Sequence, residues 1–249
     1  MTLVLVLLGL GVVIGTISQR ATGMGFALLM APFFALVFGP KDGVLLMNLG
    51  GGFSALIVLA QVWRDVDWKR FGLLIAGALP SGYLGAWVVT RLDSSVLQII
   101  LGLLLIAALS VSTMSKKRGE PRLFAPGALL AGGISGFTNA TAGIGGPPVA
   151  IYAQRSGWAQ KNFSATLQPV FAVMSFSAFG AKTLLAGMEP GLTWWIYPGM
   201  IVLILVGQWL AQFVTPLVKD SLARTLVIIF CYIGAVSAVV DGVIELVSR

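Results

Sequence analysis

Charged and reactive side chains are scarce in this chain. Only 10% of its 249 residues are charged, histidine is absent, and cysteine occurs once, at Cys231. Enzymatic chemistry needs a nucleophile with a base, or a metal cluster, and the sequence contains neither pattern. The single cysteine also excludes an intrachain disulfide. We therefore expect no enzyme active site, no bound metal and no cofactor.

Apolar residues dominate instead. They make up 57% of the sequence, with a mean hydropathy of +0.95, far above the range of soluble domains. Six runs approach the roughly 20 residues that a helix needs to cross a bilayer. They lie at about 44–63, 70–90, 95–114, 163–185, 193–214 and 222–240. The composition predicts a multi-pass, all-α integral membrane protein of the inner (cytoplasmic) membrane, and the net charge of +7 lies in short loops, so no nucleic-acid partner is expected.

Two polar, glycine-containing stretches interrupt the apolar runs 120 residues apart. Residues 17–25 (ISQRATGMG) align with residues 137–145 (FTNATAGIG). Further matched positions are Asn48 with Gln168 and, at a slightly longer offset, Gly82 with Gly207. Two copies of one unit, each with a helix that breaks within the membrane, are typical of transporters whose site lies between the copies.

Four shorter apolar stretches flank the two breaks, at about 3–17, 24–38, 124–137 and 144–153. Each pair forms either one broken span or a hairpin that enters and leaves on one side. Two hairpins divide the loop Lys and Arg residues 11 to 3 between the faces, whereas single crossings divide them 8 to 6. The 11 to 3 division fits the positive-inside rule. Ten full crossings would distribute the loops between the two faces in the same way as the hairpins, but the four shorter stretches are short for spanning a bilayer.

The 11 to 3 division of the hairpin arrangement concerns the Lys and Arg residues of the predicted loops. One face receives Arg64, Lys69, Arg70, Lys116, Lys117, Arg118, Arg122, Arg155, Lys161, Lys219 and Arg224, and the other receives Lys41, Arg91 and Arg249. The face with eleven basic residues is predicted to be cytoplasmic, because Lys and Arg accumulate in cytoplasmic loops.

The hairpin arrangement predicts two inverted repeats, each a re-entrant helical hairpin followed by three transmembrane helices. The first repeat covers residues 1–114, with its hairpin at about 3–38. A basic cytoplasmic linker, residues 115–122, leads to the second repeat, residues 123–249, with its hairpin at about 124–153. Each repeat makes an odd number of crossings, so both termini are predicted on the non-cytoplasmic side.

The breaks supply groups that suit an anion. Helices that begin near Gly25 and Gly146 direct free backbone N–H groups and positive dipole ends at the turns. Glycine permits the tight turn, and Pro147 and Pro148 suit the first turn of a helix. The predicted substrate-binding residues are Ser18, Gln19, Arg20, Thr22, Gly23, Gly25, Asn48, Thr138, Asn139, Thr141, Gly143, Gly145, Gly146 and Gln168.

Arg20 is the charged member of this set. A charge inside a membrane segment is a functional hypothesis by default, and no acidic residue lies near Arg20 in the sequence. Each of these residues also has a structural alternative. Arg20 would then snorkel to water or cap helix carbonyls, and the glycines would allow close helix packing. Asn48 and Gln168 would hydrogen-bond neighbouring helices. Lys182 is expected to snorkel at the outer end of its span.

At the paired breaks the sequence resembles the TauE/SafE family of sulfite and organosulfonate exporters. The most specific part is residues 136–148 (GFTNATAGIGGPP), similar to that family's glycine-rich motif with its following proline. Residues 22–25 with Pro32 look like the matching element of the first copy, and Pro147 stands where a further glycine is common. The resemblance implies a multi-spanning permease for small sulfur-containing anions.

The leading hypothesis is a secondary transporter or facilitator that binds sulfite or an organosulfonate at the midplane, between the hairpin tips. An inside-negative potential contributes ~2.3 kcal/mol per charge per 100 mV to anion exit, so export needs no coupling ion. The alternatives are a proton-coupled importer, with Asp241 in its pathway, an anion channel, and a non-transporting assembly subunit. The expected partners are the small anion, the lipid bilayer and a second copy of the chain in a homodimer.

Overall fold

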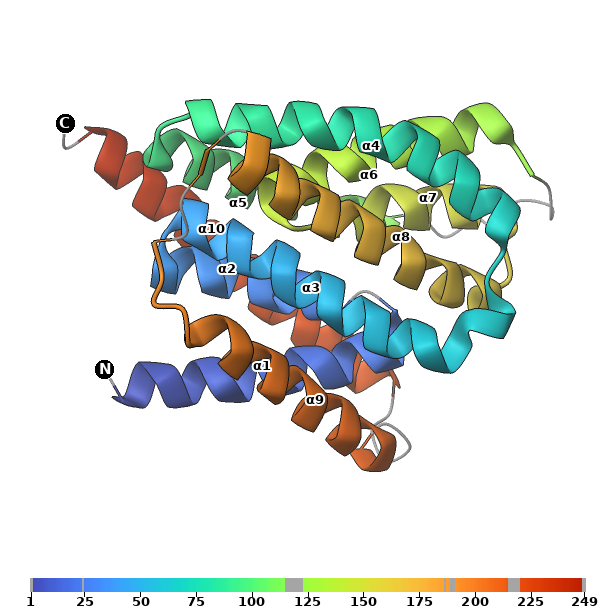
Figure 1. Ribbon diagram of the computed structural model, residues 1–249, viewed down its shortest axis with the longest axis horizontal. Coiled ribbons are helices and arrows are strands. Elements are labelled where there is room, and N and C mark those ends of the chain that lie inside the picture. The colour runs from blue at the N-terminus through green and yellow to red at the C-terminus, as the bar shows by residue number, and fades with distance from the viewer. Residues whose placement is uncertain are drawn as a thin grey trace.

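Apolar runs of this length form helices because in lipid every backbone polar group must be satisfied within the segment. In the computed structural model the described residues form ten α-helices with a 3-10 turn, η1, and a π-helical turn, η2 (Figure 1). The elements are α1 (Thr2–Thr22), α2 (Gly25–Phe38), α3 (Pro40–Val62), η1 (Trp63–Asp65), α4 (Trp68–Arg91), α5 (Ser94–Met114), α6 (Ala125–Ala142), α7 (Gly146–Arg155), α8 (Gln160–Gly180), η2 (Ala181–Leu185), α9 (Ile196–Val214) and α10 (Asp220–Val247).

The structure describes residues 2–23, 25–114, 123–185, 187–188, 191–214 and 220–247. Within these ranges, the side chains of residues 2–8, 20–22, 105, 108–109, 111–114, 214 and 220–231 are not described. The predicted linker 115–122 lies outside the described residues.

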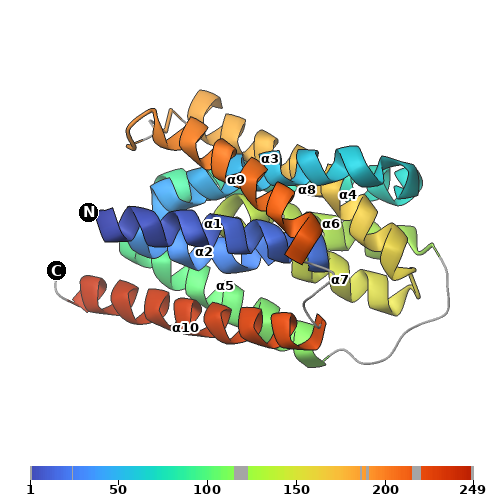
Figure 2. The ribbon, with the colours of Figure 1, turned by 90° about the horizontal axis from the view of Figure 1, so that it is seen from below.

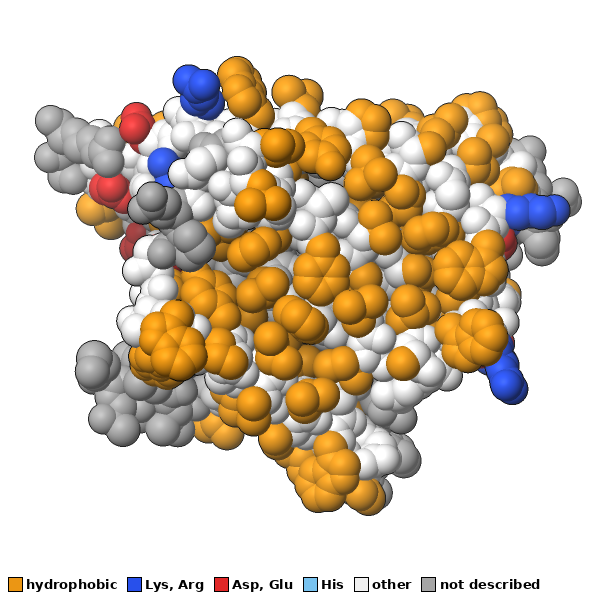
Figure 3. All heavy atoms as spheres, in the orientation of Figure 1, with side chains coloured by type: hydrophobic (Ala, Val, Ile, Leu, Met, Phe, Trp, Pro, Cys, Tyr) orange, Lys and Arg blue, Asp and Glu red, His pale blue; other side chains and the backbone are white. Residues whose placement is uncertain are grey.

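Each of the six predicted spans is a helix, α3, α4, α5, α8, α9 and α10, so the all-α prediction is confirmed. Four helical segments among the described residues are long and apolar enough to cross a membrane: Pro40–Asp65, Trp68–Arg91, Gln160–Leu185 and Ile196–Phe213. Apolar side chains also cover the visible face of the molecule (Figure 3), and exposed residues include Trp87, Leu130 and Trp209. Such a surface suits lipid rather than water.

Both breaks turn the chain back on itself. Gly15 of α1 faces Met30 of α2, and Ser135 of α6 donates a hydrogen bond to the Gly145 carbonyl at the start of α7. Much of each polar stretch is helical in the structure. Helix α1 continues to Thr22 and α6 to Ala142, beyond the predicted ends of the apolar stretches at about residues 17 and 137. The long arms of 21 and 18 residues span roughly 30 Å, at 1.5 Å per residue, whereas α2 and α7 are shorter, with 14 and 10 residues.

Contacts at one end of the bundle join two loops that are distant in sequence. Lys161 forms a 2.8 Å ion pair with Asp65, and Asn162 Nδ2 donates a 2.9 Å hydrogen bond to the Asp65 carbonyl. The Arg70 guanidinium lies 4.5 Å from the ring centroid of Trp158. The loops before α4 and α8 therefore share one end of the molecule, as the hairpin arrangement predicts. The single-crossing arrangement would put these two loops on opposite faces of the membrane.

The beginning of α1 and the end of α10 both lie at the other end of the molecule, apart from each other (Figures 1 and 2). The Gly191 N–H donates a 3.0 Å hydrogen bond to Asp42 Oδ1, so the loops before α3 and α9 are also adjacent.

Glycine brings α4 and α6 into backbone contact. A Cβ at Gly136 would overlap the Ala78 carbonyl, so the two helices pack closely through small residues. A Cβ at Gly82 would lie 3.6 Å from the Gly136 carbonyl oxygen, and one at Gly207 would lie 2.9 Å from Thr16 Cβ. Gly136 of α6 and Thr16 of α1 are themselves 120 residues apart. The matched glycines Gly82 and Gly207 therefore contact equivalent positions of the two halves.

Helices α3 and α8 lie side by side at the centre of the bundle (Figure 1). In the apolar stretches of α3 and α8, 67% of the residues are buried, whereas the corresponding share is 33% in α4 and 28% in α9. Because these two helices carry Asn48 and Gln168, the fold places the matched polar residues in its interior.

Candidate functional site

The first break is a left-handed turn at Gly23. Its φ is 84°, a conformation that glycine adopts without steric cost, and its N–H donates a 2.7 Å hydrogen bond to the Gln19 carbonyl. Helix α2 then begins at Gly25, where a Cβ would lie 2.6 Å from the backbone carbon of Ser18. Glycine is therefore required at both positions, once for the backbone angle and once for space.

Gln168 of α8 holds this break from the other half of the chain. Gln19 Nε2 donates a 3.2 Å hydrogen bond to Gln168 Oε1. Gln168 Nε2 in turn donates to the Gly23 carbonyl at 3.2 Å and to the Ser164 carbonyl at 2.9 Å. Both glutamines are buried, so these bonds satisfy groups that have little access to water.

The second break has the same local form. Gly143 has φ 71°, and its N–H donates a 2.9 Å hydrogen bond to the Asn139 carbonyl. A Cβ on Gly143 would overlap Met47 of α3, so this glycine too is required for space as well as for angle. Helix α7 begins at Gly146, but Pro147 and Pro148 lack N–H groups. This helix end therefore presents fewer donors to an anion than the start of α2.

Asn48 of α3 holds the second break. Its Nδ2 donates a 3.0 Å hydrogen bond to the Asn139 carbonyl, which also accepts the N–H of Gly143. Asn139 Nδ2 donates to Ser175 Oγ of α8 at 3.4 Å. On the far side of Asn48, Lys182 Nζ donates a 2.5 Å hydrogen bond to its Oδ1. Asn48 thus links the break to a lysine on η2.

The two breaks exchange their polar partners. The first break, in the first half, is held by Gln168 of the second half, and the second break is held by Asn48 of the first. Asn48 and Gln168 are 120 residues apart, as are Gln19 and Asn139. Asn48 and Gln168 both hydrogen-bond neighbouring helices, which the sequence had left open beside a role in substrate binding. What they bond is the broken backbone itself, which the sequence did not indicate.

One face of the α8–η2 segment carries polar residues that belong to the hydrogen-bond networks of both breaks. Gln168, Ser175 and Lys182 recur every seven residues, so they lie near one another around the helix axis. Gln168 and Ser175 are separated by roughly 10 Å along the axis, at 1.5 Å per residue. This spacing was a signal in the sequence, and it would have pointed to Lys182 as a member of the site.

Lys182 is fully buried, with 0% of its surface exposed, so the expectation that it snorkels to an interface is wrong. Arg70 pairs with Asp67 and Lys161 with Asp65, whereas no ion pair of Lys182 is described. Within the same part of the chain, no three His, Cys, Asp or Glu residues gather as metal ligands.

The remaining predicted residues differ in their surroundings. Thr141 is buried and donates a 2.9 Å hydrogen bond to the Phe137 carbonyl of its own helix. Thr138 similarly donates to the Ile134 carbonyl at 3.0 Å. Ser18 is buried against the start of α2. The side chains of Arg20 and Thr22 lie outside the described part of the structure.

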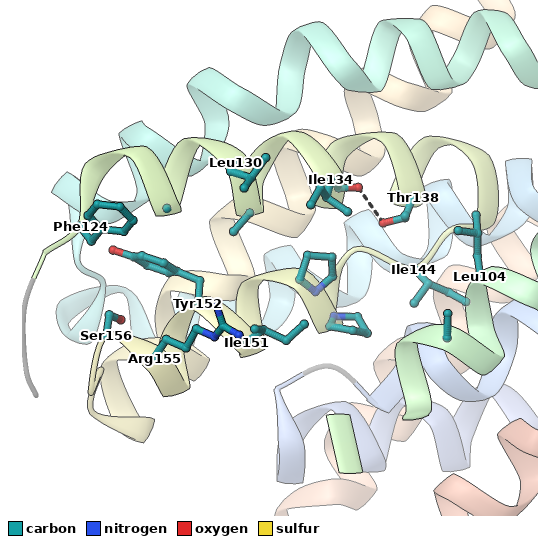
Figure 4. A pocket seen from close by; sticks show the side chains of 15 residues that line it. Leu104, Phe124, Leu130, Ile134, Thr138, Ile144, Ile151, Tyr152, Arg155 and Ser156 are labelled. Atoms are coloured by element: carbon teal, nitrogen blue, oxygen red, sulfur yellow. Dashed lines mark hydrogen bonds between the residues drawn. The ribbon is translucent and has the colours of Figure 1, made fainter. Parts of the chain in front are cut away.

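A cavity of about 520 Å³ lies between α6 and α7 and is closed on one side by α5 (Figure 4). Thr138 and Ile144 line one end, beside the second break, and Tyr152 and Arg155 line the other (Figure 4). The Tyr152 hydroxyl is buried without a hydrogen-bond partner among the described residues. The remaining lining is mostly apolar: Leu104, Ala107, Phe124, Gly127, Leu130, Ala131, Ile134, Pro147, Pro148, Ile151 and Ser156.

A multi-pass helical bundle with two broken helices around buried polar groups has the architecture of a membrane transporter. The sulfite exporter TauE/SafE family matches residues 7–238, nearly the whole chain, and the protein belongs to this transporter family. The chain is 27% identical over 192 residues to a probable sulfite/organosulfonate exporter TauE from Cupriavidus necator, a match that covers 70% of each chain. No solved structure matches the chain.

Proposed function

We propose that this protein exports a small sulfur-containing oxyanion, sulfite or an organosulfonate, across the cytoplasmic membrane. The substrate binds between the two breaks, among the substrate-binding residues predicted from the sequence. Family membership supports the substrate class, and the name of the Cupriavidus necator relative supports the direction.

The observation that carries this proposal is the exchange of Gln168 and Asn48 between the two breaks. Such an exchange is expected when two inverted repeats face each other across a pseudo-two-fold axis. The helix contacts support the same symmetry, since α1 packs on α9 as α6 packs on α4, and α3 and α5 each pack on their own counterparts, α8 and α10. The site then lies at the repeat interface.

Uncommitted N–H donors make this interface suitable for an anion. A carboxamide has two N–H donors, and Gln19 and Asn48 each use one in a described hydrogen bond. The N-terminus of α2 adds backbone donors and the positive end of a dipole. Arg20, next to Gln19 in the sequence, adds a positive charge in this proposal.

The cavity provides an access route to the second break. It leads from Arg155 to Thr138 and Ile144, so an anion that meets the guanidinium is directed along α7 toward the break. We place the Arg155 end at the cytoplasm, because the loop that follows Arg155 joins the basic loop before α4. Both termini then lie on the non-cytoplasmic side.

The charge arrangement favours export over proton-driven import. The membrane potential already drives an anion outward, by ~2.3 kcal/mol per charge per 100 mV. Import would need a proton carrier, and the candidate carrier, Asp241, is exposed on α10. Export without a coupling ion therefore agrees best with the side chains that surround the breaks.

Flux through liposomes tests the proposal directly. The purified protein is reconstituted, and the transport of sulfite, taurine, isethionate, sulfoacetate and sulfate is measured with an imposed membrane potential. We expect saturable flux of at least one sulfite or sulfonate anion, accelerated by a potential that is negative on the substrate side. A lack of flux for every anion overturns the proposal and favours a non-transporting assembly subunit.

Two variants then test the site. Arg20→Gln and Thr138→Val are expected to lower flux or affinity at least tenfold, whereas the control Arg91→Gln, at an exposed position, leaves both unchanged. Unaltered transport in both site variants overturns the site while leaving the function intact. The homodimer stays a prediction, and light scattering of the purified protein measures it.

A further inference from the structure

Lys182 carries a buried amine that has no acidic partner among the described residues. Its side chain is fully enclosed, and its one described hydrogen bond goes to the neutral Asn48 Oδ1 at 2.5 Å. An ammonium group has three N–H donors, so two are left without a described acceptor. Buried charges are normally paired, because a charge removed from water is otherwise costly. A Lys182 ammonium therefore has no counter-ion among the described side chains.

The backbone around Lys182 is also unusual. It lies on η2, a π-helical turn that continues α8, and such turns occur frequently at functional sites. Helical side chains point toward the N-terminus of their helix, so the ammonium lies deeper in the bundle than its Cα. Its neighbour Ala181 packs in a buried cluster with Ala140, three residues before the left-handed Gly143. Lys182 is thus placed beside the second break.

The two halves of the chain are unlike at this position. Counting back 120 residues from Lys182 leads to Val62, just as counting forward from Arg20 leads to Ala140. The shared scaffold of the breaks therefore does not need a lysine here. A residue that only supported the fold of each repeat would be expected in both copies, whereas a single site between the copies needs its charge once.

We propose that Lys182 is the substrate-binding cation of the second break, and that its ammonium moves from Asn48 to the transported oxyanion. This inference rests on the proposed function. When the anion accepts hydrogen bonds from Lys182, Asn48 Oδ1 loses its donor, and Asn48 is the residue that holds the Asn139 carbonyl. Occupancy by the anion is thereby transmitted to the break.

The enclosure of Lys182 bears on the mechanism. A residue with 0% exposure is reached by an anion only after α8 and η2 have moved against α3. A static anion channel keeps its charged residues accessible along an open pore. Lys182 as a ligand therefore favours alternating access, in which one repeat moves relative to the other.

Variants of Lys182 distinguish a ligand from a structural residue. Lys182→Met keeps the length of the side chain and removes its charge, Lys182→Gln keeps a polar group, and Lys182→Arg keeps the charge. Lys69→Met is the matched control, because Lys69 is exposed. For each protein, the KM and maximal rate of sulfite flux in liposomes are measured, together with the unfolding midpoint in detergent with and without sulfite.

We expect Lys182→Met and Lys182→Gln to raise the KM for sulfite at least tenfold and to abolish the stabilisation by sulfite. Their unfolding midpoints without sulfite should equal or exceed that of the wild type, since an unpaired buried charge is removed. Lys182→Arg should recover part of the affinity, and Lys69→Met should stay within twofold of the wild type.

A wild-type KM in Lys182→Met or Lys182→Gln overturns the assignment of Lys182. A lower unfolding midpoint with unchanged stabilisation by sulfite also overturns it, because that result marks a structural lysine. Neither result affects the proposed function, which fails instead if the wild-type protein moves none of the tested anions.

Discussion

Gln19 and Gln168 are joined by a 3.2 Å hydrogen bond, although 149 residues separate them in the chain. The same Gln168 amide donates to the carbonyl of Gly23, which gives the first break its turn. A polar residue of one half thus stabilises the broken backbone of the other half. Movement of one half against the other must stretch or exchange these bonds, which connects the packing of the breaks to transport.

A double-mutant cycle measures this link. We expect Gln19→Leu and Gln168→Leu each to destabilise the protein and to be non-additive, with a coupling of about 0.6 kcal/mol and at most about 1.7 kcal/mol, as for other hydrogen bonds between membrane helices. Gln208→Leu is the control, because both polar atoms of buried Gln208 lack partners in the described structure. It should leave stability equal or higher. Unfolding midpoints in detergent measure all four effects, and full additivity would contradict the coupling.

Substitution of the turn glycines separates backbone angle from space. Gly143→Ala forces a Cβ into the left-handed region, at about 1–2 kcal/mol, and also into Met47. Gly187→Ala has a similar φ of 65° with nothing within 4 Å, so it reports the angle alone. We expect Gly143→Ala to lower the unfolding midpoint more than Gly187→Ala, and Met47→Ala to recover part of the difference. Equal losses would show that Met47 makes no contribution.

The contact between α4 and α6 is testable with two glycines on the same helix. A Cβ at Gly136 would overlap the Ala78 carbonyl, whereas one at Gly133 would lie 3.7 Å from the Gly77 carbonyl oxygen, an ordinary contact. Gly136→Ala is expected to destabilise by roughly 1–3 kcal/mol through overpacking. Gly133→Ala should be neutral or stabilising, because alanine favours helix by up to ~1 kcal/mol. Thermal unfolding of both variants measures the difference, and a reversed order would contradict the packing.

Topology is testable by labelling from one side of the membrane. In a Cys231→Ser background, single cysteines are introduced as Arg118→Cys, Lys161→Cys and Lys41→Cys. We expect an impermeant thiol reagent outside intact spheroplasts to label only Lys41→Cys, and lysis to expose the other two. Positions 161 and 118 should behave alike, because the charge count assigns both to the cytoplasmic face. Labelling of residue 118 in intact cells would contradict the hairpin arrangement.

Much of the architecture was readable from the sequence. Helices are the simplest solution for long apolar runs in lipid, so all six predicted spans appear as helices. The 120-residue offset aligns Gly23 with Gly143, and both adopt the left-handed conformation that few residues other than glycine accept. The division of basic residues between loops predicted which loops share one end, and the contact between Lys161 and Asp65 agrees.

Only the tertiary structure decided how the halves interlock. A repeat in the sequence says that Asn48 and Gln168 are alike, but not that each serves the break of the opposite copy. The cavity beside α7 depends on the packing of three helices, which no local pattern encodes. Lys182 shows the same limit. Its position near the end of an apolar run is equally compatible with snorkelling and burial, and the choice depends on whether a neighbour such as Asn48 meets the ammonium inside the bundle.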